Sequence, residues 1–321
     1  MDLIWTDKDG VDVGVILHYN LDNEISIEGK NCSFVLELPI DTDILNNCGF
    51  IYFDDTEYGG IIDSQTIDTA KKVMSLSGRT WRGILYSKIV EPSENESHYV
   101  VTGDVNAVLA EIIAKLSLTD FFEADPEPFG VDVFYQFDRY TDGYTGIVKM
   151  LASLDLKLML RWTGGKVRIY AEEIERFDDT NAITSDLFDF QITSARNSVN
   201  HMIGLGSGEL EERMIVHKYI QADGTIGDVQ HYFGVKEYVA VYELSNASSI
   251  EELEEGTIEA LEEESLENQI QINSYNLECD LGDKFTAHDI YTGISVEQYV
   301  TNKIVVISDS KAKISYKVGA L

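Results

Sequence analysis

The sequence has few cysteines and few prolines. Its three cysteines, Cys32, Cys48 and Cys279, are spread over 321 residues. An odd and widely spaced set of this kind predicts neither a disulfide framework nor a zinc site, and it is typical of reduced thiols in a protein made in a cytoplasm. Only four prolines stand against 17 tyrosines. Together with many isoleucines and valines, this composition favours a fold rich in β-strands.

Basic residues are also scarce. The chain has 24 Lys and Arg against 57 Asp and Glu, which gives a formal net charge of −33. Specific nucleic-acid binding needs clustered Lys and Arg, so we expect none. Attraction to an anionic membrane is disfavoured for the same reason. The acidic excess has two interpretations: it keeps the protein soluble, or it lines a surface past which a polyanion must slide without adhering.

Long apolar runs are absent as well. No stretch reaches the roughly 18 apolar residues that a membrane-spanning helix needs, so we expect no transmembrane segment. The first ten residues, MDLIWTDKDG, lack the basic start and the apolar centre of a secretory signal. We therefore expect a protein that does not associate with membranes.

Motifs for catalysis, cofactors and metals are missing too. The segment GLGSGE at 204–209 lacks the last small residue of a dinucleotide fingerprint and precedes no amphipathic helix, so it predicts a glycine-rich turn between strands. The six histidines contain no His-x-x-x-His pair, and the Asp spacing in DKDGVD at 7–12 does not suit a calcium loop. No Gly-x-Ser-x-Gly elbow occurs. We predict no catalytic, cofactor-binding or metal-binding residues, and no enzyme activity.

Residues 1–95 have the pattern of a small β-barrel or sandwich. Short runs rich in β-branched and aromatic residues are separated by Asn, Asp and Gly clusters, at a spacing of roughly 10–15 residues. The runs lie at 11–20, 32–40, 49–55, 59–67 and 71–78. A short helical connection, WRGILYSKIV, follows at 81–90 and leads out of the predicted barrel.

Residues 96–190 predict a separate α+β unit. Asp104 is a good N-cap for a helix whose apolar stripe runs from Val105 to Leu116 at helical spacing. A strand, a second helix and a hairpin follow, at 131–137, 144–154 and 156–173. The hairpin is predicted from a Gly-Gly pair, which supplies the positive φ of a primed turn.

Residues 191–321 return to strands, with an acidic helix inserted at about 248–267. Ser249 and Glu252 have the spacing of a capping box at the helix start. Nine of the 17 residues at 251–267 are Glu. We interpret this run as the solvated face of a helix that packs through its leucines, and a metal-collecting acidic surface is the alternative.

One stretch of the sequence occurs twice in similar form. Residues 49–75 align with 282–308 at a constant offset of 233, with seven identities in 27 positions. The centre of the match is Tyr58–Ile61 (YGGI) against Tyr291–Ile294 (YTGI). We interpret the pair as one barrel corner built twice, in which the second glycine permits the turn. The predicted fold is therefore mainly β, with two similar small β-barrel domains that flank an α+β domain.

Several segments also occur in a characteristic order. In the C-terminal half they are NSVNHMIGLGSGELEERMIVHKYIQADG at 197–224, the acidic helix with the Ser-Asn before it, and LGDKFTAHDIYTGI at 281–294. In the N-terminal half, 34–92 contains a Ser-Gly-Arg strand followed by a short helix. This order resembles the tail-hub, or tail-associated, proteins of long-tailed phages and prophages. The resemblance covers nearly the whole chain and implies the baseplate-hub fold.

The resemblance implies a structural protein of a virion tail, assembled in the cytoplasm of a bacterial host. Two like-folded barrels per chain in a homotrimer would present six similar modules, which joins a sixfold tail tube to a threefold tip. The implied partners are the tail tube or distal tail protein and the tip or spike proteins. DNA would pass through the ring without specific binding, because an acidic lining repels its phosphates.

Two other functions are alternatives. Many tail-associated proteins continue into peptidase, lysozyme-like or receptor-binding domains, whereas this chain ends at Leu321, after the second predicted barrel. The first alternative is nevertheless a cell-wall-degrading glycosidase or peptidase of the tail tip. The second is a carbohydrate-binding tail-tip module that uses Tyr135 and Tyr140 as stacking platforms. Half-buried strand packing is the simpler interpretation of these two tyrosines.

Overall fold

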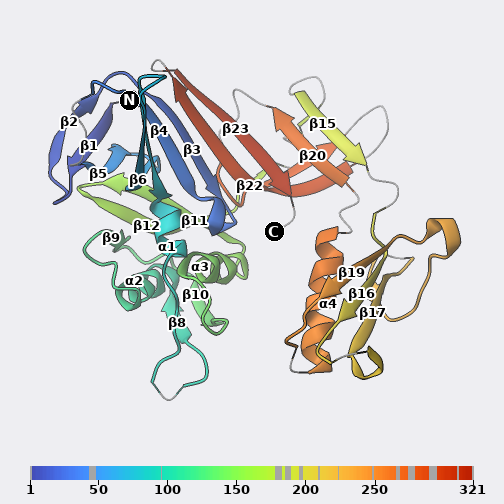
Figure 1. Cartoon of the computed structure of the whole chain (residues 1–321). Coiled ribbons are helices and arrows are strands. Elements are labelled where there is room, and N and C mark those ends of the chain that lie inside the picture. Colours follow the sequence, from blue (N-terminus) through green and yellow to red (C-terminus); the bar gives the residue numbers. More distant parts are fainter. Residues whose placement is uncertain are drawn as a thin grey trace. The chain divides into compact units, whose positions relative to one another are not determined.

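A computed structural model gives the fold (Figure 1). It describes residues 2–319 except 43–47, 95, 178–182, 185–188, 195–197, 209, 223, 248, 265–267, 274–278, 289–294 and 309–310. The chain forms two compact units, residues 1–190 with 270–321 and residues 191–269. Strands predominate in the element order, so the predicted mainly β class is confirmed. Within the described chain, no helix is long and apolar enough to cross a membrane.

The first 80 residues supply seven strands of the first unit. They are β1 (Leu3–Asp7), β2 (Asp12–Ile16), β3 (Asn20–Ser26), β4 (Ser33–Pro39), β5 (Cys48–Phe53), β6 (Gly59–Asp68) and β7 (Val73–Thr80), with the 3-10 turn η1 (Gly29–Asn31) after β3. β4 alternates strictly between exposed and buried residues, as a half-buried strand requires. Its buried side chains Phe34, Leu36 and Leu38 join Leu21 and Met74 in one apolar core.

The C-terminal strands extend the same sheet. β22 (Ser295–Ser308) pairs with β3, with Asn302 opposite Ser26, and β23 (Lys311–Gly319) pairs with the other side of β22. From β20 (Asn268–Asn273) to β2, the strand order is β20-β23-β22-β3-β4-β7-β6-β5-β1-β2. The other strands of this region are β13 (Arg176–Phe177), β14 (Ile183–Thr184), β15 (Asp189–Ser194) and β21 (Lys284–His288). Strands from both ends of the chain therefore share one sheet.

The two predicted barrels stay a prediction. In the described structure the sheet is open at β2, which pairs with β1 alone, and no pairing closes a barrel. The division into 1–95, 96–190 and 191–321 also stays a prediction. The compact units differ from it in grouping 270–321 with the N-terminal part, because the ladder between β22 and β3 attaches the last strands to the first.

A layer of helices and short strands follows the N-terminal strands. Its elements are α1 (Trp81–Tyr86), β8 (Val100–Asp104), α2 (Val105–Lys115), β9 (Phe122–Ala124), β10 (Asp132–Gln136), α3 (Gly143–Ala152), β11 (Leu156–Thr163) and β12 (Lys166–Glu173). Asp104 caps α2 by accepting a hydrogen bond from Asn106 N at 3.0 Å. Gly164 and Gly165, both at positive φ, turn the chain from β11 into β12. The predicted helices and hairpin are confirmed here.

The second unit packs one helix on a small sheet. Its elements are β16 (His201–Leu205), η2 (Leu210–Glu212), β17 (Ile215–Ile220), β18 (Ile226–Gly227), η3 (Gly234–Lys236), β19 (Val239–Glu243) and α4 (Ile250–Glu264), with strand order β18-β17-β16-β19. Leu253 and Leu261 of α4 are fully buried. The Ser249 hydroxyl accepts a hydrogen bond from Glu252 N at 3.2 Å. The described part of the acidic run, 251–264, is therefore a solvated helix that packs through its leucines, as predicted, and 265–267 lie outside the described residues.

The internal repeat corresponds to one hairpin in each copy. Residues 49–75 contain β5, β6 and the start of β7, whereas the described residues of 282–308 form β21 and β22 alone. β5 with β6, and β21 with β22, are both antiparallel pairs. Val73 begins a third strand, while the aligned Val306 lies near the end of β22. The two copies thus share an antiparallel pair but not its register, because Ile51 pairs with Gly60 whereas the aligned Lys284 pairs with Tyr299. Tyr291–Ile294 lies outside the described residues.

Gly60 corrects the interpretation of the repeat. It lies inside β6, between Ile51 of β5 and Thr80 of β7, and not in a turn. A Cβ at this position would be 2.1 Å from the Arg79 carbonyl oxygen and 2.7 Å from the Phe34 ring. The position requires glycine because a neighbouring backbone approaches it closely.

Substitution of Gly60 by Ala is expected to lower the free energy of unfolding by about 1–3 kcal/mol, because β6 and β7 must move apart. Urea unfolding measures the loss. Gly14→Ala on β2 is the matched control, since the nearest atom to its new Cβ is Trp5 Nε1 at an ordinary 3.7 Å. Equal stability of the two variants would contradict the close-approach argument.

Candidate functional site

Arg82 lies in the interior of the first unit. It is the second residue of α1, whose N-cap Thr80 accepts a hydrogen bond from Gly83 N at 3.4 Å. The helix is buried from Trp81 to Leu85, and Arg82 itself is 2% exposed. The short helix thus carries a guanidinium away from bulk water. A buried charge of this kind is tolerated only when its donors have partners.

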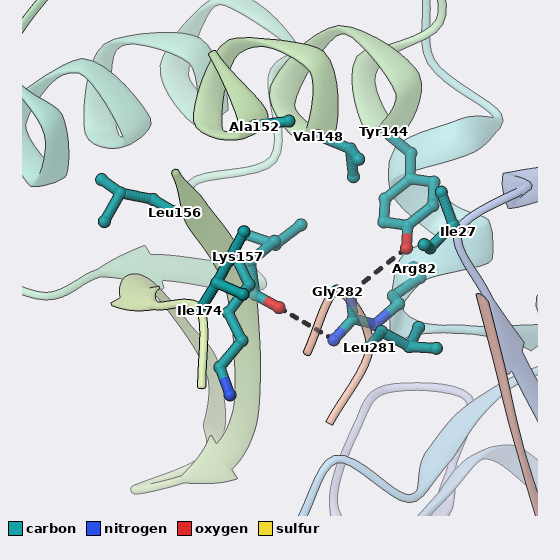
Figure 2. Close-up of a pocket in the computed structure, with 11 residues that line it drawn as sticks. Ile27, Arg82, Tyr144, Val148, Ala152, Leu156, Lys157, Ile174, Leu281 and Gly282 are labelled. Atoms are coloured by element: carbon teal, nitrogen blue, oxygen red, sulfur yellow. Dashed lines mark hydrogen bonds between the residues drawn. The ribbon is translucent and has the colours of Figure 1, made fainter. Parts of the chain in front are cut away.

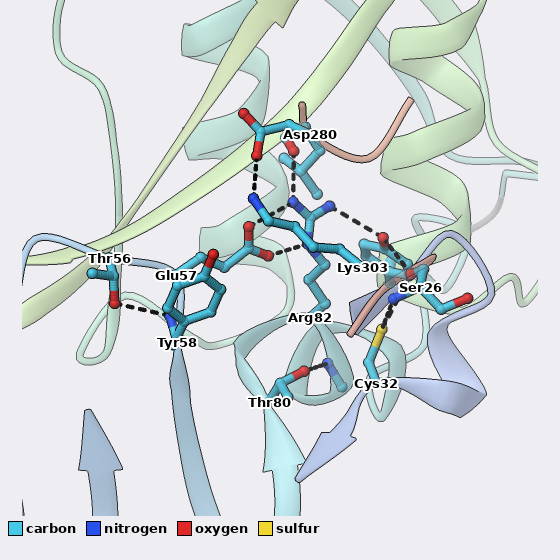
Figure 3. A network of polar contacts seen from close by, with 12 residues as sticks. Ser26, Cys32, Thr56, Glu57, Tyr58, Thr80, Arg82, Asp280 and Lys303 are labelled. Carbon is cyan, nitrogen blue, oxygen red and sulfur yellow. Dashed lines mark hydrogen bonds and ion pairs between the residues drawn. The ribbon is translucent and has the colours of Figure 1, made fainter. Parts of the chain in front are cut away.

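Three segments supply the partners of Arg82. Its Nη2 donates to the Leu158 carbonyl of β11 at 2.9 Å, and its Nη1 donates to the Tyr144 hydroxyl of α3 at 3.1 Å. Nε and Nη2 form a two-point ion pair with the Glu57 carboxylate, in the turn before β6 (Figure 3). The Tyr144 hydroxyl donates in turn to the Ser26 carbonyl at the end of β3, at 2.8 Å. One side chain therefore connects the sheet to the layer of helices.

The protonation state of this group is fixed by its surroundings. Burial alone would lower the pKa of Arg82, but the Glu57 carboxylate and the Tyr144 oxygen raise it well above its usual value. Burial also raises the pKa of the Tyr144 hydroxyl. Neither group changes its charge near neutral pH, so the pair does not suit general acid–base catalysis.

Two further ion pairs attach the C-terminal strands. Lys157 Nζ of β11 lies 2.6 Å from Asp283 Oδ1, and the two side chains are 5% and 1% exposed. Asp283 also accepts hydrogen bonds from the backbone amides of Glu175 and Asp280, at 2.9 and 2.7 Å. Lys303 of β22 donates to the Asp280 carboxylate at 2.8 Å (Figure 3). The chain before β21 is therefore held from both sides.

The pair of Lys303 and Asp280 is ionised in the folded protein. Burial would lower the pKa of Lys303, but the Tyr58 oxygen and the Asp280 carboxylate raise it. Burial would raise the pKa of Asp280, but Lys303 brings it below its usual range. Both shifts have the sign expected for a stabilised ion pair. The contact thus persists over the whole neutral range of pH.

A small cavity lies beside this network (Figure 2). Arg82, Tyr144, Lys157 and Gly282 are among the residues that line it, and its volume is about 20 Å³. A space of this size holds about one water molecule. Ligand sites for organic molecules are larger by roughly a factor of ten or more. The network is therefore suited to holding segments together and not to binding a cofactor or substrate.

The three cysteines offer no activated nucleophile. Burial raises the pKa of Cys32 to about 11 and the pKa values of Cys48 and Cys279 to about 12. The thiolate is the reactive form, and thiols with such pKa values are protonated at neutral pH. No cluster of three or more His, Cys, Asp or Glu in the described part of the chain could hold a metal ion. The lack of catalytic, cofactor and metal residues stays a prediction.

The other sequence features have plain structural roles. Gly206 and Gly208 lie in the connection between β16 and β17, so the glycine-rich turn is confirmed. Tyr135 is half-buried and packs edge-on against Phe137, with ring centroids 5.0 Å apart. Tyr140 is 57% exposed. The structure gives these two tyrosines different environments, which does not favour a shared stacking platform.

Sequence reasoning missed a histidine cluster in the second unit. His201 Nε2 lies 2.9 Å from His217 Nδ1, and His201 Nδ1 lies 2.8 Å from the Glu237 carboxylate. The His201 ring stacks on Tyr219 at 4.3 Å. The two histidines come from neighbouring strands that pair with His201 opposite Tyr219. Only the register of β16 and β17 brings them together, and no spacing in the sequence signals it.

Replacement of Arg82 by Met is expected to lower the free energy of unfolding by about 3–5 kcal/mol, because Glu57 is left buried without its cation. Urea unfolding followed by tryptophan fluorescence measures this. Arg79→Met is the control, since its pair with Asp63 is about 40% exposed on each side and should cost at most about 1 kcal/mol. Similar losses for both variants would mean that the buried network does not constrain the fold.

Acid is expected to weaken the second unit through His217. Burial and the neighbouring His201 lower the pKa of His217, so its contribution to stability is complete above the unfolded value of about 6.5 and is lost as the pH falls. Between about pH 7.5 and 5.5, the thermal midpoint should fall by at least about 2 °C more in the wild type than in His217→Gln. His18→Gln, at an exposed site, should behave as the wild type does. Identical pH profiles for all three proteins would refute the prediction.

Two solved structures share this fold over nearly the whole chain. The 43 kDa tail protein of prophage MuSo2 from Shewanella oneidensis matches with a TM-score of 0.53 and 11% identity, over 100% of this chain and 98% of that one. The prophage tail protein gp18 from Listeria monocytogenes matches with a TM-score of 0.50 and 11% identity, over 99% and 94%. Neither a protein-family model nor a curated protein matches the sequence. The chain has the fold of prophage tail proteins, which confirms at the level of the fold the resemblance found in the sequence.

Proposed function

We propose that the protein is a structural, non-enzymatic component of a phage or prophage tail. The observation that carries this proposal is the fold shared with two prophage tail proteins over nearly the full length of each chain. The candidate site supports it as well. Arg82, Lys157 and Lys303 are used to join segments of the chain, and the cavity beside them has room for about one water molecule.

The more specific proposal is a hub at the distal end of the tail. The protein forms a homotrimer on assembly, and the ring joins the tail tube or distal tail protein to the tip or spike proteins. A threefold ring with two similar modules per chain matches a sixfold tube. The β5–β6 and β21–β22 hairpins are the best candidates for the repeated modules, because the sequence match covers both and both are antiparallel pairs.

The acidic charge fits a ring through which DNA passes. Three chains carry 3 × −33 = −99 formal charges. A lumen lined by part of this charge repels phosphates, so that DNA moves through the ring without adhering. In this proposal the protein acts by shape and charge, is located in the virion tail, and assembles in the host cytoplasm.

Co-expression with the tail-tube and tip proteins of the phage or prophage that encodes it is expected to yield a complex that contains three copies of this chain. Native mass spectrometry gives the copy number, and electron microscopy gives the ring and the sign of the charge in its lumen. A monomeric isolated chain is compatible with the proposal, because the ring is proposed to form only during assembly with the other tail proteins.

Four outcomes would contradict the proposal. A complex with two or four copies of the chain would contradict the threefold ring. A basic or apolar lumen would contradict the proposed passage of DNA. Clearing of a peptidoglycan gel by the purified chain would favour the cell-wall-degrading alternative. Recovery of the protein only with unrelated cytoplasmic enzymes would remove the tail role altogether.

A further inference from the structure

β2 is the last strand of the sheet in the described structure (Figure 1). It pairs with β1 alone, with Leu3 opposite Ile16 and Ile4 opposite Val15. Its outer edge presents backbone N–H and C=O groups that no described strand satisfies. An edge of this kind is a template on which a strand of another polypeptide can add to the sheet.

Apolar side chains are exposed on and beside the same strand. Val13 and Val15 of β2 are 51 and 46% exposed, and Leu17, directly after the strand, is 75% exposed, whereas the intervening Ile16 is buried. Val11, before the strand, lies on the face opposite Val15, because the bulge near Val13 shifts the alternation of side chains by one residue. The apolar row is therefore Val13, Val15 and Leu17, and its contiguous exposure beside the free edge marks an interaction site that one added strand can cover.

The strand carries little of the protection that free edges usually have. Segment 11–17 contains no Lys and no Pro, and its one charged residue, Asp12, accepts a hydrogen bond from the Tyr52 hydroxyl at 2.9 Å. A bulge near Val13 is the one irregularity in its pairing with β1. Proteins blunt unused edges with Lys, Pro or inward-pointing charges as well as with bulges. The protection of this short strand is therefore concentrated around Asp12 and the bulge, and the stretch from Gly14 to Leu17 carries neither Lys, Pro, charge nor bulge.

A groove of about 410 Å³ lies at one end of the row. Trp5, Val15, Leu17 and Pro39 are among the residues that line it. Alternate side chains of an added strand point to one side of the sheet. Apolar side chains at alternate positions would therefore cover the row, and the last of them would enter the groove.

Carboxylates flank the row at both ends. Asp7 at the end of β1 and Asp9 in the turn after it lie at one end, with one basic residue, Lys8, and Asp41 lines the groove at the other end. A second copy of β2 would bring like charges together in either direction. In parallel pairing, the turn between β1 and β2 of one copy would lie beside the same turn of the other copy. In antiparallel pairing, Asp7 and Asp9 of one copy would lie beside Asp41 of the other. Like charges placed opposite each other destabilise a strand pair.

We propose that β2 is a docking edge for an extended segment of a different protein, with apolar residues at alternate positions and Lys or Arg at its ends. The segment pairs its backbone with the free edge of β2 and buries its apolar side chains on Val15, Leu17 and the groove. Its basic ends lie against the flanking carboxylates. The inference rests on the edge strand itself and holds whether or not the chain forms a tail ring.

Two synthetic peptides of about nine residues, the length of a long strand, test this docking edge. One is KTVTVTVTK, and the other, ETVTVTVTE, has the same core with acidic ends. Binding of each labelled peptide to the full chain is followed by fluorescence anisotropy. At low salt the Lys-ended peptide is expected to bind at least about tenfold more tightly, and the difference should shrink at high salt because exposed charges are screened.

Val15→Thr with Leu17→Thr removes part of the apolar row without a change of charge. This variant is expected to bind the Lys-ended peptide at least about tenfold more weakly, because the buried apolar area is lost. Val35→Thr with Ile67→Thr is the matched control, since these residues are 42 and 48% exposed on inner strands β4 and β6. It should bind as the wild type does.

The proposal fails if neither peptide binds, if both bind equally, or if the β2 variant binds as well as the control. It also fails if sedimentation shows a wild-type dimer that the β2 variant no longer forms, because a second copy would then be the occupant. None of these results bears on the tail-ring proposal, which depends on the copy number in the assembled complex.

Discussion

The buried guanidinium of Arg82 is the interaction on which the rest of the first unit depends. A charge that is 2% exposed costs several kcal/mol of desolvation unless its donors are satisfied. Its partners come from a turn of the sheet, from α3 and from β11. They reach the guanidinium together in only one relative placement of these elements. The network therefore favours that placement over others in which apolar contacts alone would be equally good.

Buried ion pairs also hold the C-terminal strands, at the turn before β21. The ladder between β22 and β3 sets their register, and Lys303, on the same strand, reaches Asp280. Lys157 of β11 then holds Asp283, the last residue of the buried turn that leads into β21. Backbone pairing fixes one side of this turn and the ion pairs fix the other. Segments from both ends of the sequence thus become one compact unit, while 191–269 builds its own core around α4.

The elements that could be predicted from the sequence are those defined by neighbouring residues. The cap at Asp104, the Gly164-Gly165 turn and the capping box at Ser249 each act within one element. Pairing of β22 with β3 could not be predicted, because it depends on register between distant strands. Arg82 is an equally instructive case. Nothing near it in the sequence separates it from Arg79, which is three residues earlier and half-exposed, since burial is decided by Tyr144 and Leu158 far along the chain.

Two further differences between sequence and structure have the same cause. The sequence signals a turn at Gly60, but the structure needs glycine there because the backbone of β7 approaches it. His201 and His217 meet across a strand pair that no local pattern reveals. In each case the decisive neighbour belongs to another strand. Local propensity predicts the existence of an element, whereas packing between elements decides what a given side chain does there.

The scarcity of basic residues has a consequence for association. Arg82, Lys157, Lys218 and Lys303 are all at most 12% exposed, and each is paired with a carboxylate. These pairs add no net charge to the interior, so the acidic excess of the chain acts at its surface. Surface charge selects partners by sign, through repulsion of wrong partners as much as through attraction of right ones. In the proposed ring, copies of this chain would therefore meet through surfaces other than the acid-flanked edge of β2, which would leave that edge open to a partner of opposite charge.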